Sequence, residues 1–496
     1  MPATRQSVLK TLNFGSRTAE DEQQGLADYF VETDQWGKLL AGEVDIVYGA
    51  KGSGKSALFF LLKAKEATFA GQGVSLIAGE NPRGATVFQE LATEPPVSER
   101  QFVNLWKLYL LSLIGGAIRE REIKNPDADA LLGILRDAGL IESEGGLRSI
   151  LKTVLVYVRR FSGLEAGLSL DPVTGAPSGI TGRIVFEQPS TQQRLSGLSS
   201  VDDLFESADR VLRDEKHETW VLLDRLDVAF SETPDLEKNA LRALFKTYLD
   251  LQSYTQIKLK IFLRSDIWTR LTVAGFREAS HITRAVTLKW DRTSLLNLIS
   301  LRALRSSELR EFYSVDEQLL KSVKDQETLF YWMFPDKVES GSNKSRTLDW
   351  LLSHTQDGTR QTAPRELIHL LNCIRDAQSK QLQLGQTAPE NNELFTRTAI
   401  KEGMPEVSQA RLEQTLYAEY PSLKPKCEAL RGEKSAQTTE NLAACWGMDS
   451  TEALIWARKL VEVGFFEERI IKEQTTFWVP FLYRYALELV QGTATD

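Results

Sequence analysis

The chain has 496 residues, 42% of them hydrophobic and 26% charged, which is the composition of a globular protein and excludes a disordered, collagen-like or fibrous one. At about 150 residues per domain, this length predicts about three domains. The 60 basic and 68 acidic side chains give a net charge of −8. The protein as a whole is therefore not a basic nucleic-acid coat, and any nucleic-acid contact needs a local patch.

The first half of the chain alternates helical and strand patterns. Apolar spacing predicts a helix at 19–40, then a strand at 44–48 that leads into a glycine-rich turn at 49–54 and a further helix. Between 163 and 189, Gly, Pro and Thr with β-branched pairs predict an inserted β-hairpin, with a surface loop as the equal alternative. Helices alternating with short strands predict an α/β fold, a mostly parallel sheet with helices on both faces. Further strands are predicted at 73–78, 220–223, 258–263 and 285–288, and helices at 99–122, 146–161, 200–214 and 235–253.

The second half is predicted to be helical and to end in a winged-helix-like module. A helix pair surrounds Gly447, and the runs 465–471 and 475–479 predict a β-hairpin behind it. Three helices and a hairpin are typical of a winged helix. The predicted domains are 1–290 for the α/β domain, 291–403 for a helical lid and 404–496 for the winged-helix-like module.

The cysteines and histidines show no metal or disulfide pattern. They stand far apart without C-x-x-C spacing, so the sequence predicts neither a disulfide framework nor a metal cluster, and it fits a reducing cytosol. The N-terminus lacks the apolar segment of a signal peptide. The longest apolar run, 108–118, is shorter than the roughly 20 residues of a membrane span, so it predicts a buried helix. The protein is expected to be cytoplasmic, without membrane contact. The cysteines of the chain are Cys373, Cys427 and Cys445, and its histidines are His217, His281, His354 and His369.

The strongest motif is G-A-K-G-S-G-K-S at 49–56, which matches G-x-x-x-x-G-K-[ST] between a predicted strand and helix. Its glycines let successive N–H groups wrap a phosphate, and the helix N-terminus adds its positive dipole end. Lys55 is expected to reach the β- and γ-phosphates, and Ser56 to bind Mg²⁺. An ordinary glycine-rich turn is the alternative. The sequence thus predicts ATP and Mg²⁺ binding by Gly49, Ala50, Lys51, Gly52, Ser53, Gly54, Lys55 and Ser56.

The loop requires an acidic partner at the end of a neighbouring apolar strand, and Asp224 supplies it after the run 220–223. We expect Asp224 to hold the Mg²⁺ shell; a turn aspartate is the alternative. Most AAA-type ATPases place a glutamate directly after this aspartate, whereas this chain has Arg225. Asp227 is therefore the candidate catalytic base. If Asp227 instead caps a helix or pairs with an arginine, hydrolysis is slow.

Two arginines are predicted to complete the nucleotide site. Arg264 ends a strand, where α/β sheets bind ligands, so it is a candidate contact for the γ-phosphate; a solvated charge is the alternative. Arg365 follows Pro364 at the start of a helix, from which it is expected to reach the nucleotide; an intrahelical ion pair is the alternative. A homo-oligomer is expected to use an arginine finger between subunits. Its candidates are Arg270, Arg277 and Arg284.

The segments VYGAKGSGKSAL, VLLDRLDVAF, KIFLRSDIW and TAPRELIHLL together resemble the STAND and KAP-like branch of bacterial P-loop ATPases. The resemblance runs from Phe14 to about residue 380, and the winged-helix-like end fits the domain order of STAND proteins. It implies a nucleotide-controlled switch that assembles when triggered, in a group often found in defence-type operons. This chain lacks a C-terminal repeat array, and about 40 residues precede its phosphate loop. A partner protein is therefore expected to supply sensing or effector function.

The sequence leaves two main functions open. The first is a Mg²⁺-dependent ATPase, slow or triggered, that acts as a switch regulating a partner effector in anti-phage defence. The alternative is a DNA-binding AAA-like ATPase of the initiator or loader type that uses its winged helix. From Met404 to Asp496, ten Lys and Arg stand against fourteen Asp and Glu, which disfavours nucleic acid, because phosphate contacts need local positive charge. A third hypothesis is a scaffold protein that is stabilised by bound nucleotide and scarcely hydrolyses ATP.

Overall fold

The structure is a computed structural model, and its chain divides into two compact units. Unit 1 comprises residues 1–33, 50–54 and 288–496, and unit 2 comprises residues 34–49 and 55–287. Each unit is described by itself. The structure describes residues 3–18, 21, 22, 25–81, 86–88, 91, 95, 96, 98–141, 146–162, 184–226, 234–316, 322–386, 388–471 and 474–494.

Unit 2 is built on a five-stranded sheet with the order β2-β5-β6-β1-β7. The pairings of β2 with β5, β5 with β6 and β6 with β1 are parallel. Strands buried on both faces read as near-continuous apolar runs, as residues 220–223 of β5 and 261–263 of β6 do. The strands are β1 (Ile46–Gly49), β2 (Val74–Ala78), β5 (Glu218–Leu223), β6 (Ile257–Arg264) and β7 (Ala285–Leu288).

Helices surround this sheet, and side-chain caps start several of them. The Ser200 side chain accepts from the Asp203 N–H, and that carboxylate in turn accepts from the Ser200 N–H, a reciprocal capping box. The helices are α2 (Asp34–Leu40), α3 (Lys55–Ala64), α4 (Glu66–Gly71), α6 (Glu99–Glu120), α7 (Pro126–Asp137), α8 (Leu147–Ser162), α9 (Thr191–Leu195), α10 (Val201–Asp214), α11 (Pro234–Leu251) and α12 (Ser265–Val273).

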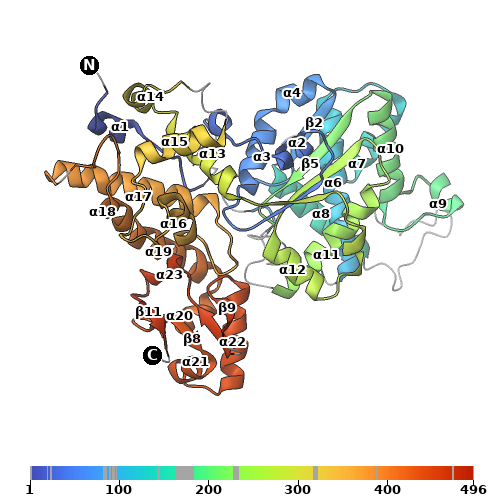
Figure 1. Cartoon of the computed structure of the whole chain (residues 1–496). Helices are drawn as coiled ribbons and strands as arrows, with labels where there is room; N and C mark the ends of the chain where they lie inside the picture. Colours follow the sequence, from blue (N-terminus) through green and yellow to red (C-terminus); the bar gives the residue numbers. More distant parts are fainter. Residues whose placement is uncertain are drawn as a thin grey trace. The chain divides into compact units, whose positions relative to one another are not determined.

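The two faces of the sheet pack against different helices, as alternation along a strand requires. On one face Trp220 of β5 packs on Phe69 of α4, and Phe262 of β6 packs on Phe59 of α3. On the other face Val221 joins the main core with α6, α10 and α11 (Figure 1). The predicted α/β class, a parallel sheet with helices on both faces, is therefore confirmed.

Helix α6 contains the predicted apolar run 108–118. Among the described residues it is the one helix long and apolar enough to cross a membrane, but 67% of its most apolar stretch is buried inside the protein. Its neighbours are α8, α10 and α11. It is thus the central core helix of unit 2.

Unit 1 joins the N-terminal segment to the helical region and the winged-helix-like module. One hydrophobic core runs through all three, from Val8 near the N-terminus through Leu367 to Phe477. Its helices are α1 (Arg5–Thr11), α13 (Arg292–Ala303), α14 (Ser307–Tyr313), α15 (Val323–Met333), α16 (Thr347–His354), α17 (Pro364–Gln383), α18 (Arg397–Glu402) and α19 (Met404–Arg411), with the 3₁₀ helix η2 (Leu26–Tyr29) and the π-helix η6 (Leu412–Tyr417).

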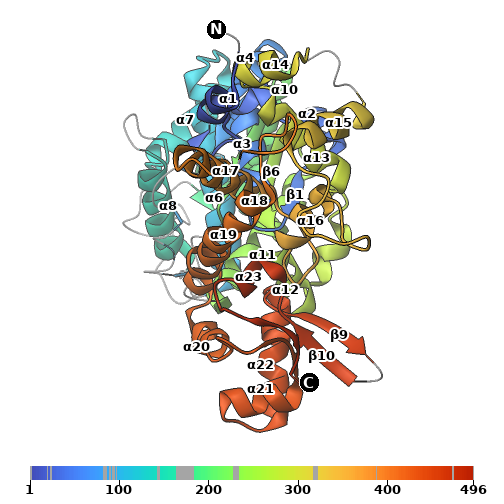
Figure 2. The same ribbon diagram turned by 60° about the vertical axis from the view of Figure 1, so that its left-hand side comes forward.

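The C-terminal module has the predicted winged-helix elements. Gly447, at a φ of 65°, ends one helix in the left-handed conformation, and Asp449 caps the next by accepting from the Glu452 N–H at 2.9 Å. The hairpin β9–β10 lies beside that second helix (Figure 2). The sheet order is β11-β8-β10-β9, and β8 and β11 were not predicted. The elements are α20 (Lys424–Glu428), β8 (Lys434–Thr438), α21 (Thr439–Trp446), α22 (Ser450–Glu462), β9 (Glu467–Ile471), β10 (Gln474–Trp478), α23 (Phe481–Arg484) and β11 (Val490–Thr493).

Three details differ from the predicted organisation. Residues 1–33 belong with the C-terminal unit rather than with the α/β domain, because α1 packs on α14 and α17. The predicted helix at 19–40 is the 3₁₀ helix η2 followed by α2. Most of the predicted hairpin at 163–189 lies outside the described residues. At its described end, β3 (Ile184–Val185) pairs in parallel with β4 (Ser199–Ser200).

Candidate nucleotide site

The phosphate loop has the backbone that the motif requires. It connects the buried strand β1 to the helix α3, which begins at Lys55. Gly52 and Gly54 have φ angles of 79° and 99°, a region that residues with a side chain rarely adopt. The Lys55 ammonium donates to the Gly49 carbonyl at 2.9 Å, across the loop. These are the backbone features of an anion-binding loop, and the N-terminus of the helix that follows it favours an anion.

The apex of the loop, residues 50–54, packs within unit 1. The Trp290 indole N–H donates to the Ser53 carbonyl at 2.8 Å, and Lys51 forms an ion pair with Glu419. The Ser53 hydroxyl is buried and has no hydrogen-bond partner among the described residues. A buried hydroxyl normally has a partner, so this one fits a loop that receives a polar ligand.

Arg365, predicted from the sequence to contact the nucleotide, lies directly against this apex. A Cβ atom placed on Gly52 would lie 2.9 Å from Arg365 Cβ, so this position excludes any side chain. The Arg365 guanidinium donates from Nε to the Arg17 carbonyl at 3.1 Å. The predicted alternative, an intrahelical ion pair of Arg365, has no counterpart among its described contacts. Its neighbour Glu366 pairs instead with Arg411.

Asp224 directly follows strand β5 at the carboxyl edge of the sheet and is 4% exposed. The prediction placed it on a strand neighbouring the loop's strand. The sheet order corrects this, because β6 lies between β5 and β1. Arg225 follows at a φ of 56°, and its guanidinium donates to the Asn81 carbonyl at 3.2 Å. Asp227, the predicted base, lies outside the described residues.

Arg264 ends β6, the strand between those of the loop and Asp224. Its guanidinium donates two hydrogen bonds to the Asp266 carboxylate, at 2.9 and 3.0 Å. Burial would raise the pKa of Asp266, but the Arg264 charge and hydrogen bonds hold it below its usual value. Arg264 is thus held in a fixed position at the predicted edge. Of the candidate fingers, Arg270 pairs with Glu237 and Arg284 with Asp45.

Glu80 is a buried carboxyl at the same edge that the sequence did not single out. The parallel pairing of β2 and β5 continues beyond β2, where the Gly79 N–H donates to the Leu222 carbonyl at 2.9 Å. This register places Glu80 at the level of Asp224. The residue could not be found from the sequence because its position depends on the sheet order.

Glu80 is 1% exposed and held by hydrogen bonds. Its carboxylate accepts from the Thr86 hydroxyl at 2.7 Å, the Val87 N–H at 3.1 Å and the Asn81 N–H at 2.9 Å. Burial raises the pKa of Glu80 to about 7, against the lowering effect of these bonds and of the Arg225 charge. A carboxyl with this pKa exchanges a proton near neutral pH, which suits a general base.

The substitution Glu80→Gln is expected to stabilise the protein above neutral pH. Because the folded state raises the pKa of Glu80 from 4.5 to about 7, its stabilising contribution is complete below about pH 4.5 and is lost as the pH rises through 7. The neutral amide avoids this loss, which amounts to about 1–3 kcal/mol. Thermal melts should show the variant several degrees more stable than the wild type at pH 8 and nearly equal to it at pH 4. Equal midpoints at both pH values would contradict a neutral buried carboxyl.

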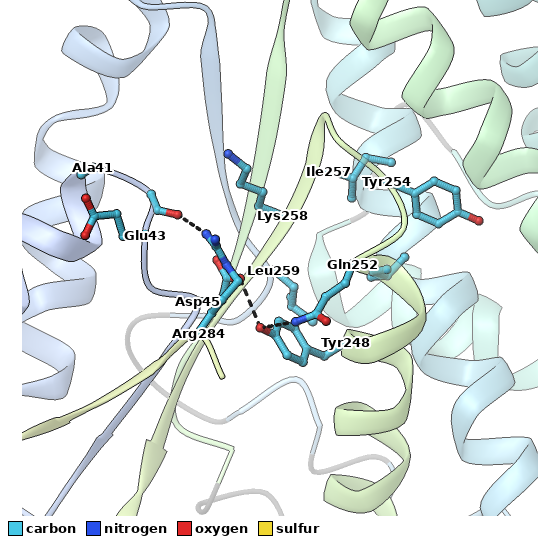
Figure 3. A pocket seen from close by; sticks show the side chains of 12 residues that line it. Ala41, Glu43, Asp45, Tyr248, Gln252, Tyr254, Ile257, Lys258, Leu259 and Arg284 are labelled. Atoms are coloured by element: carbon cyan, nitrogen blue, oxygen red, sulfur yellow. Dashed lines mark hydrogen bonds and ion pairs between the residues drawn. The ribbon is translucent and has the colours of Figure 1, made fainter. Parts of the chain in front are cut away.

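A separate cavity of about 490 Å³ lies at the opposite edge of the sheet, where β6 and β7 begin (Figure 3). Four of its polar side chains are joined by hydrogen bonds. Asp45 accepts from Arg284 Nε at 2.6 Å and from the Tyr248 hydroxyl at 3.2 Å, and that hydroxyl accepts from Gln252 at 2.8 Å. Nucleotides bind α/β sheets at the carboxyl ends of the strands, so this cavity is not the predicted site.

The comparisons with known proteins give distant structural likenesses. No protein-family model and no curated protein matches the chain. It is similar to the Aeropyrum pernix Orc1 protein in complex with DNA, with a TM-score of 0.39 and 11% identity over 95% of this chain and 96% of that one. A Walker-type ATPase of Pyrococcus abyssi gives a TM-score of 0.38 and 11% identity over 93% and 96%. Cdc6p of Pyrobaculum aerophilum gives 0.31 and 12% over 98% and 97%.

The resemblance to STAND and KAP-like ATPases is not confirmed by these comparisons, and none of them supports a role in defence. Likenesses with TM-scores below 0.5 carry no argument about the site. This structure itself shows the parallel sheet, its strand order and the glycine-rich loop between β1 and α3. On these features it has the fold of a P-loop NTPase.

Proposed function

We propose that this chain is a Mg²⁺-dependent ATPase that binds ATP at the loop 49–56. The observation that carries the proposal is the loop itself: its glycines at positive φ, the buried Ser53 hydroxyl that has no partner among the described residues, and the lysine at the start of α3. Backbone N–H groups and Lys55 hold the phosphates there. Bound Mg²⁺ supplies positive charge that neutralises the phosphate oxygens.

The remaining predicted residues have distinct roles in this proposal. Ser56 and Asp224 hold the Mg²⁺, since a hydroxyl and a carboxylate are hard oxygen donors. Arg264 is kept in place by Asp266 for contact with the γ-phosphate. Asp227 is the base assigned from the sequence, and Glu80 is the second candidate because of its position at the level of Asp224.

The two candidate bases are separated by turnover measurements. The base accepts the proton of the attacking water, so its amide variant binds ATP as the wild type does and hydrolyses it about 10²–10⁴-fold more slowly. Steady-state hydrolysis by Asp227→Asn and Glu80→Gln decides between them. Wild-type turnover in both variants would remove both assignments.

In this proposal the contacts of the loop apex respond to the bound nucleotide. The loop apex contacts Arg365 through Gly52, Trp290 through Ser53 and Glu419 through Lys51, and these partners belong to the helical region and the segment before the winged helix. A phosphate bound in the loop therefore adds negative charge close to the apex residues that Arg365 of α17 contacts. This supports a nucleotide-controlled switch.

We further propose that the winged-helix-like module contacts duplex DNA, as in initiator or loader ATPases. The support is local charge on an overall acidic module. Lys459 of α22 lies 4.3 Å from the Trp456 ring centroid, and Lys426 of α20 approaches that ring from 5.5 Å. Arg458 and Ile455 are exposed on the same helix. The charge count over residues 404–496 could not reveal this grouping, because Lys426 comes from another helix.

The double substitution Lys426→Ala/Lys459→Ala is expected to weaken duplex binding about tenfold or more. Two lost phosphate contacts reduce the slope of log affinity against log salt by about 2. Fluorescence anisotropy with a short duplex at several salt concentrations measures both quantities. The matched control is Lys324→Ala/Lys380→Ala, which removes two exposed lysines from helices outside the module. The same affinity and slope in both double variants would contradict the DNA proposal.

The effector-switch function predicts a different response. If a partner effector rather than DNA is the target, steady-state hydrolysis ignores duplex DNA and rises with the partner protein. Stimulation several-fold by DNA in the wild type supports the initiator-type function instead. A homo-oligomer is part of either proposal, and sedimentation with and without ATP tests it.

A further inference from the structure

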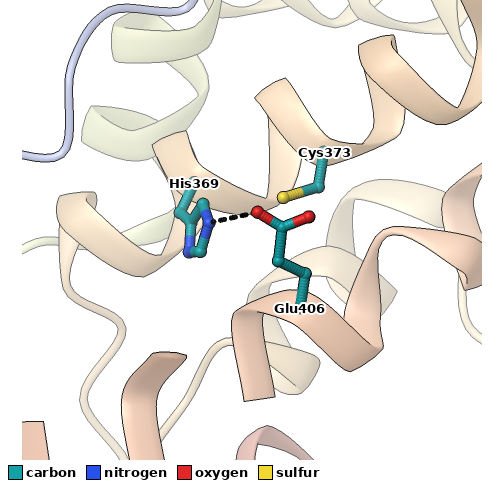
Figure 4. Close-up of side chains that lie close together, drawn as sticks. All are labelled: His369, Cys373 and Glu406. Carbon is teal, nitrogen blue, oxygen red and sulfur yellow. Dashed lines mark ion pairs between the residues drawn. The ribbon is translucent and has the colours of Figure 1, made fainter. Parts of the chain in front are cut away.

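The structure brings together three metal-ligand side chains that the sequence analysis treated as scattered. His369 and Cys373 lie one turn apart on α17, and Glu406 faces them from α19 (Figure 4). Their candidate ligand atoms all lie within 4.8 Å of one another. The histidine and the cysteine are each 8% exposed. The expectation that these residues are scattered rested on spacing along the chain, and it does not hold for these three side chains in space.

We infer that His369, Cys373 and Glu406 form a binding site for a zinc-class divalent ion that clamps α17 to α19. An imidazole nitrogen, a thiolate and a carboxylate are the donors that Zn²⁺ takes in tetrahedral sites, with three protein ligands and a water in the fourth position. Metal–ligand bonds of about 2.0–2.3 Å place neighbouring ligand atoms roughly 3.3–3.8 Å apart. The observed cluster reaches this by small rotamer changes, for which the exposed Glu406 side chain has room.

Glu406 already contacts both other members of the cluster. Its Oε1 forms an ion pair with His369 Nε2 at 3.6 Å (Figure 4), and its carboxylate also interacts with the Cys373 thiol. Asp376, one turn beyond Cys373 on α17, adds negative charge close to the thiol. Arg17 is the cation that faces the cluster, and its guanidinium is anchored on Gln414 at 3.0 Å. Asp376 itself pairs with Arg375 at 2.7 Å, so Glu406 supplies the negative charge of the cluster. The buried Cys373 thiol is neutral without metal and would release its proton on binding the ion.

The position of the cluster gives the clamp a structural consequence. One turn before His369, Glu366 of the same helix already pairs with Arg411 of α19 at 2.8 Å. A metal ion would add a second bond between these two helices. It would fix the helix whose first turn places Arg365 against the loop apex. This inference concerns binding and stability, and it stands whether or not the loop hydrolyses ATP.

Cobalt binding tests the site through its colour. The reduced, metal-free full chain is titrated with Co²⁺, and we expect one equivalent to give tetrahedral d–d bands with a thiolate-to-cobalt charge-transfer band, both removed by Zn²⁺. In Cys373→Ser the charge-transfer band should disappear and the affinity fall about a hundredfold or more. The matched control is Cys445→Ser, which removes a half-exposed cysteine of α21 and should retain the band.

The controls separate this site from the phosphate loop and from misfolding. Co²⁺ bound at the loop meets oxygen ligands and gives no thiolate band, so the readout is independent of the nucleotide proposal. Without metal, Cys373→Ser should still unfold cooperatively, with a midpoint somewhat below that of the wild type because Cys373 belongs to the buried core. Zn²⁺ should then raise the midpoint of the wild type by several degrees and leave that of the variant unchanged. No thiolate band in the wild type, a band that survives in Cys373→Ser, or equal Zn²⁺ shifts in both proteins overturns the inference.

Discussion

The substitution Lys55→Ala is expected to lower kcat/KM for ATP hydrolysis by about 10²–10³-fold, which corresponds to about 3–4 kcal/mol of transition-state stabilisation. Lys55 begins α3 and its ammonium reaches across the loop to the Gly49 carbonyl at 2.9 Å. In this position the Lys55 ammonium is expected to contact the phosphates as a positive charge. No other described residue of the loop places a positive charge at the start of α3. Steady-state phosphate release by the purified proteins measures the effect.

The matched control for this experiment is Lys63→Ala, at the other end of the same helix. Lys63 pairs with Glu66 at 2.8 Å on the surface, and such pairs contribute only about 0–1 kcal/mol to stability. This variant should hydrolyse ATP at the wild-type rate. Equal turnover by Lys55→Ala and the control would show that the loop is not the hydrolytic site.

The substitution Asp224→Asn is expected to have the second-largest effect, a loss of about a hundredfold in turnover at physiological Mg²⁺ concentration. Asp224 is buried at the end of β5, and its amide variant keeps the shape while removing the charge that holds Mg²⁺. Because the lost interaction is with the ion, raising the Mg²⁺ concentration should restore part of the activity. Titrating Mg²⁺ at saturating ATP measures this shift.

The control for Asp224 is Asp214→Asn, which removes an exposed carboxylate from the last turn of α10, shortly before β5. It should leave both turnover and the Mg²⁺ dependence unchanged. If Asp224→Asn requires no more Mg²⁺ than the wild type, the aspartate is a structural turn residue and another group holds the ion.

The parts of the fold that depend on local pattern could be predicted from the sequence. The apolar strand before the loop, the helices α6, α10 and α11, and the helix pair around Gly447 all follow from spacing and caps. The sheet order could not be predicted, because it depends on which apolar strands pair across the sheet. The same holds for β8 and β11, whose polar residues lack a strand pattern. The docking of residues 1–33 on the C-terminal unit depends on side-chain packing far along the chain.

The candidate site divides in the same way. The phosphate loop is contiguous in sequence, so its eight residues could be named directly. Asp224 was assigned to the carboxyl edge, but the strand β6 between it and the loop appears only in the sheet order. Glu80 was missed because its place at the level of Asp224 depends on strand register. The spacing of His369 and Cys373 was visible on one helix, whereas their third partner comes from another helix.

The most direct test of the central claim is an equilibrium titration of Mg²⁺ and ATP into the wild type and Lys55→Ala, followed by calorimetry. The account predicts one saturable site per chain in the wild type, Mg²⁺-dependent affinity and binding at least about a hundredfold weaker in the variant. Equal affinity in the two proteins, or no saturable binding by the folded wild type, would contradict the assignment of residues 49–56 as the ATP site.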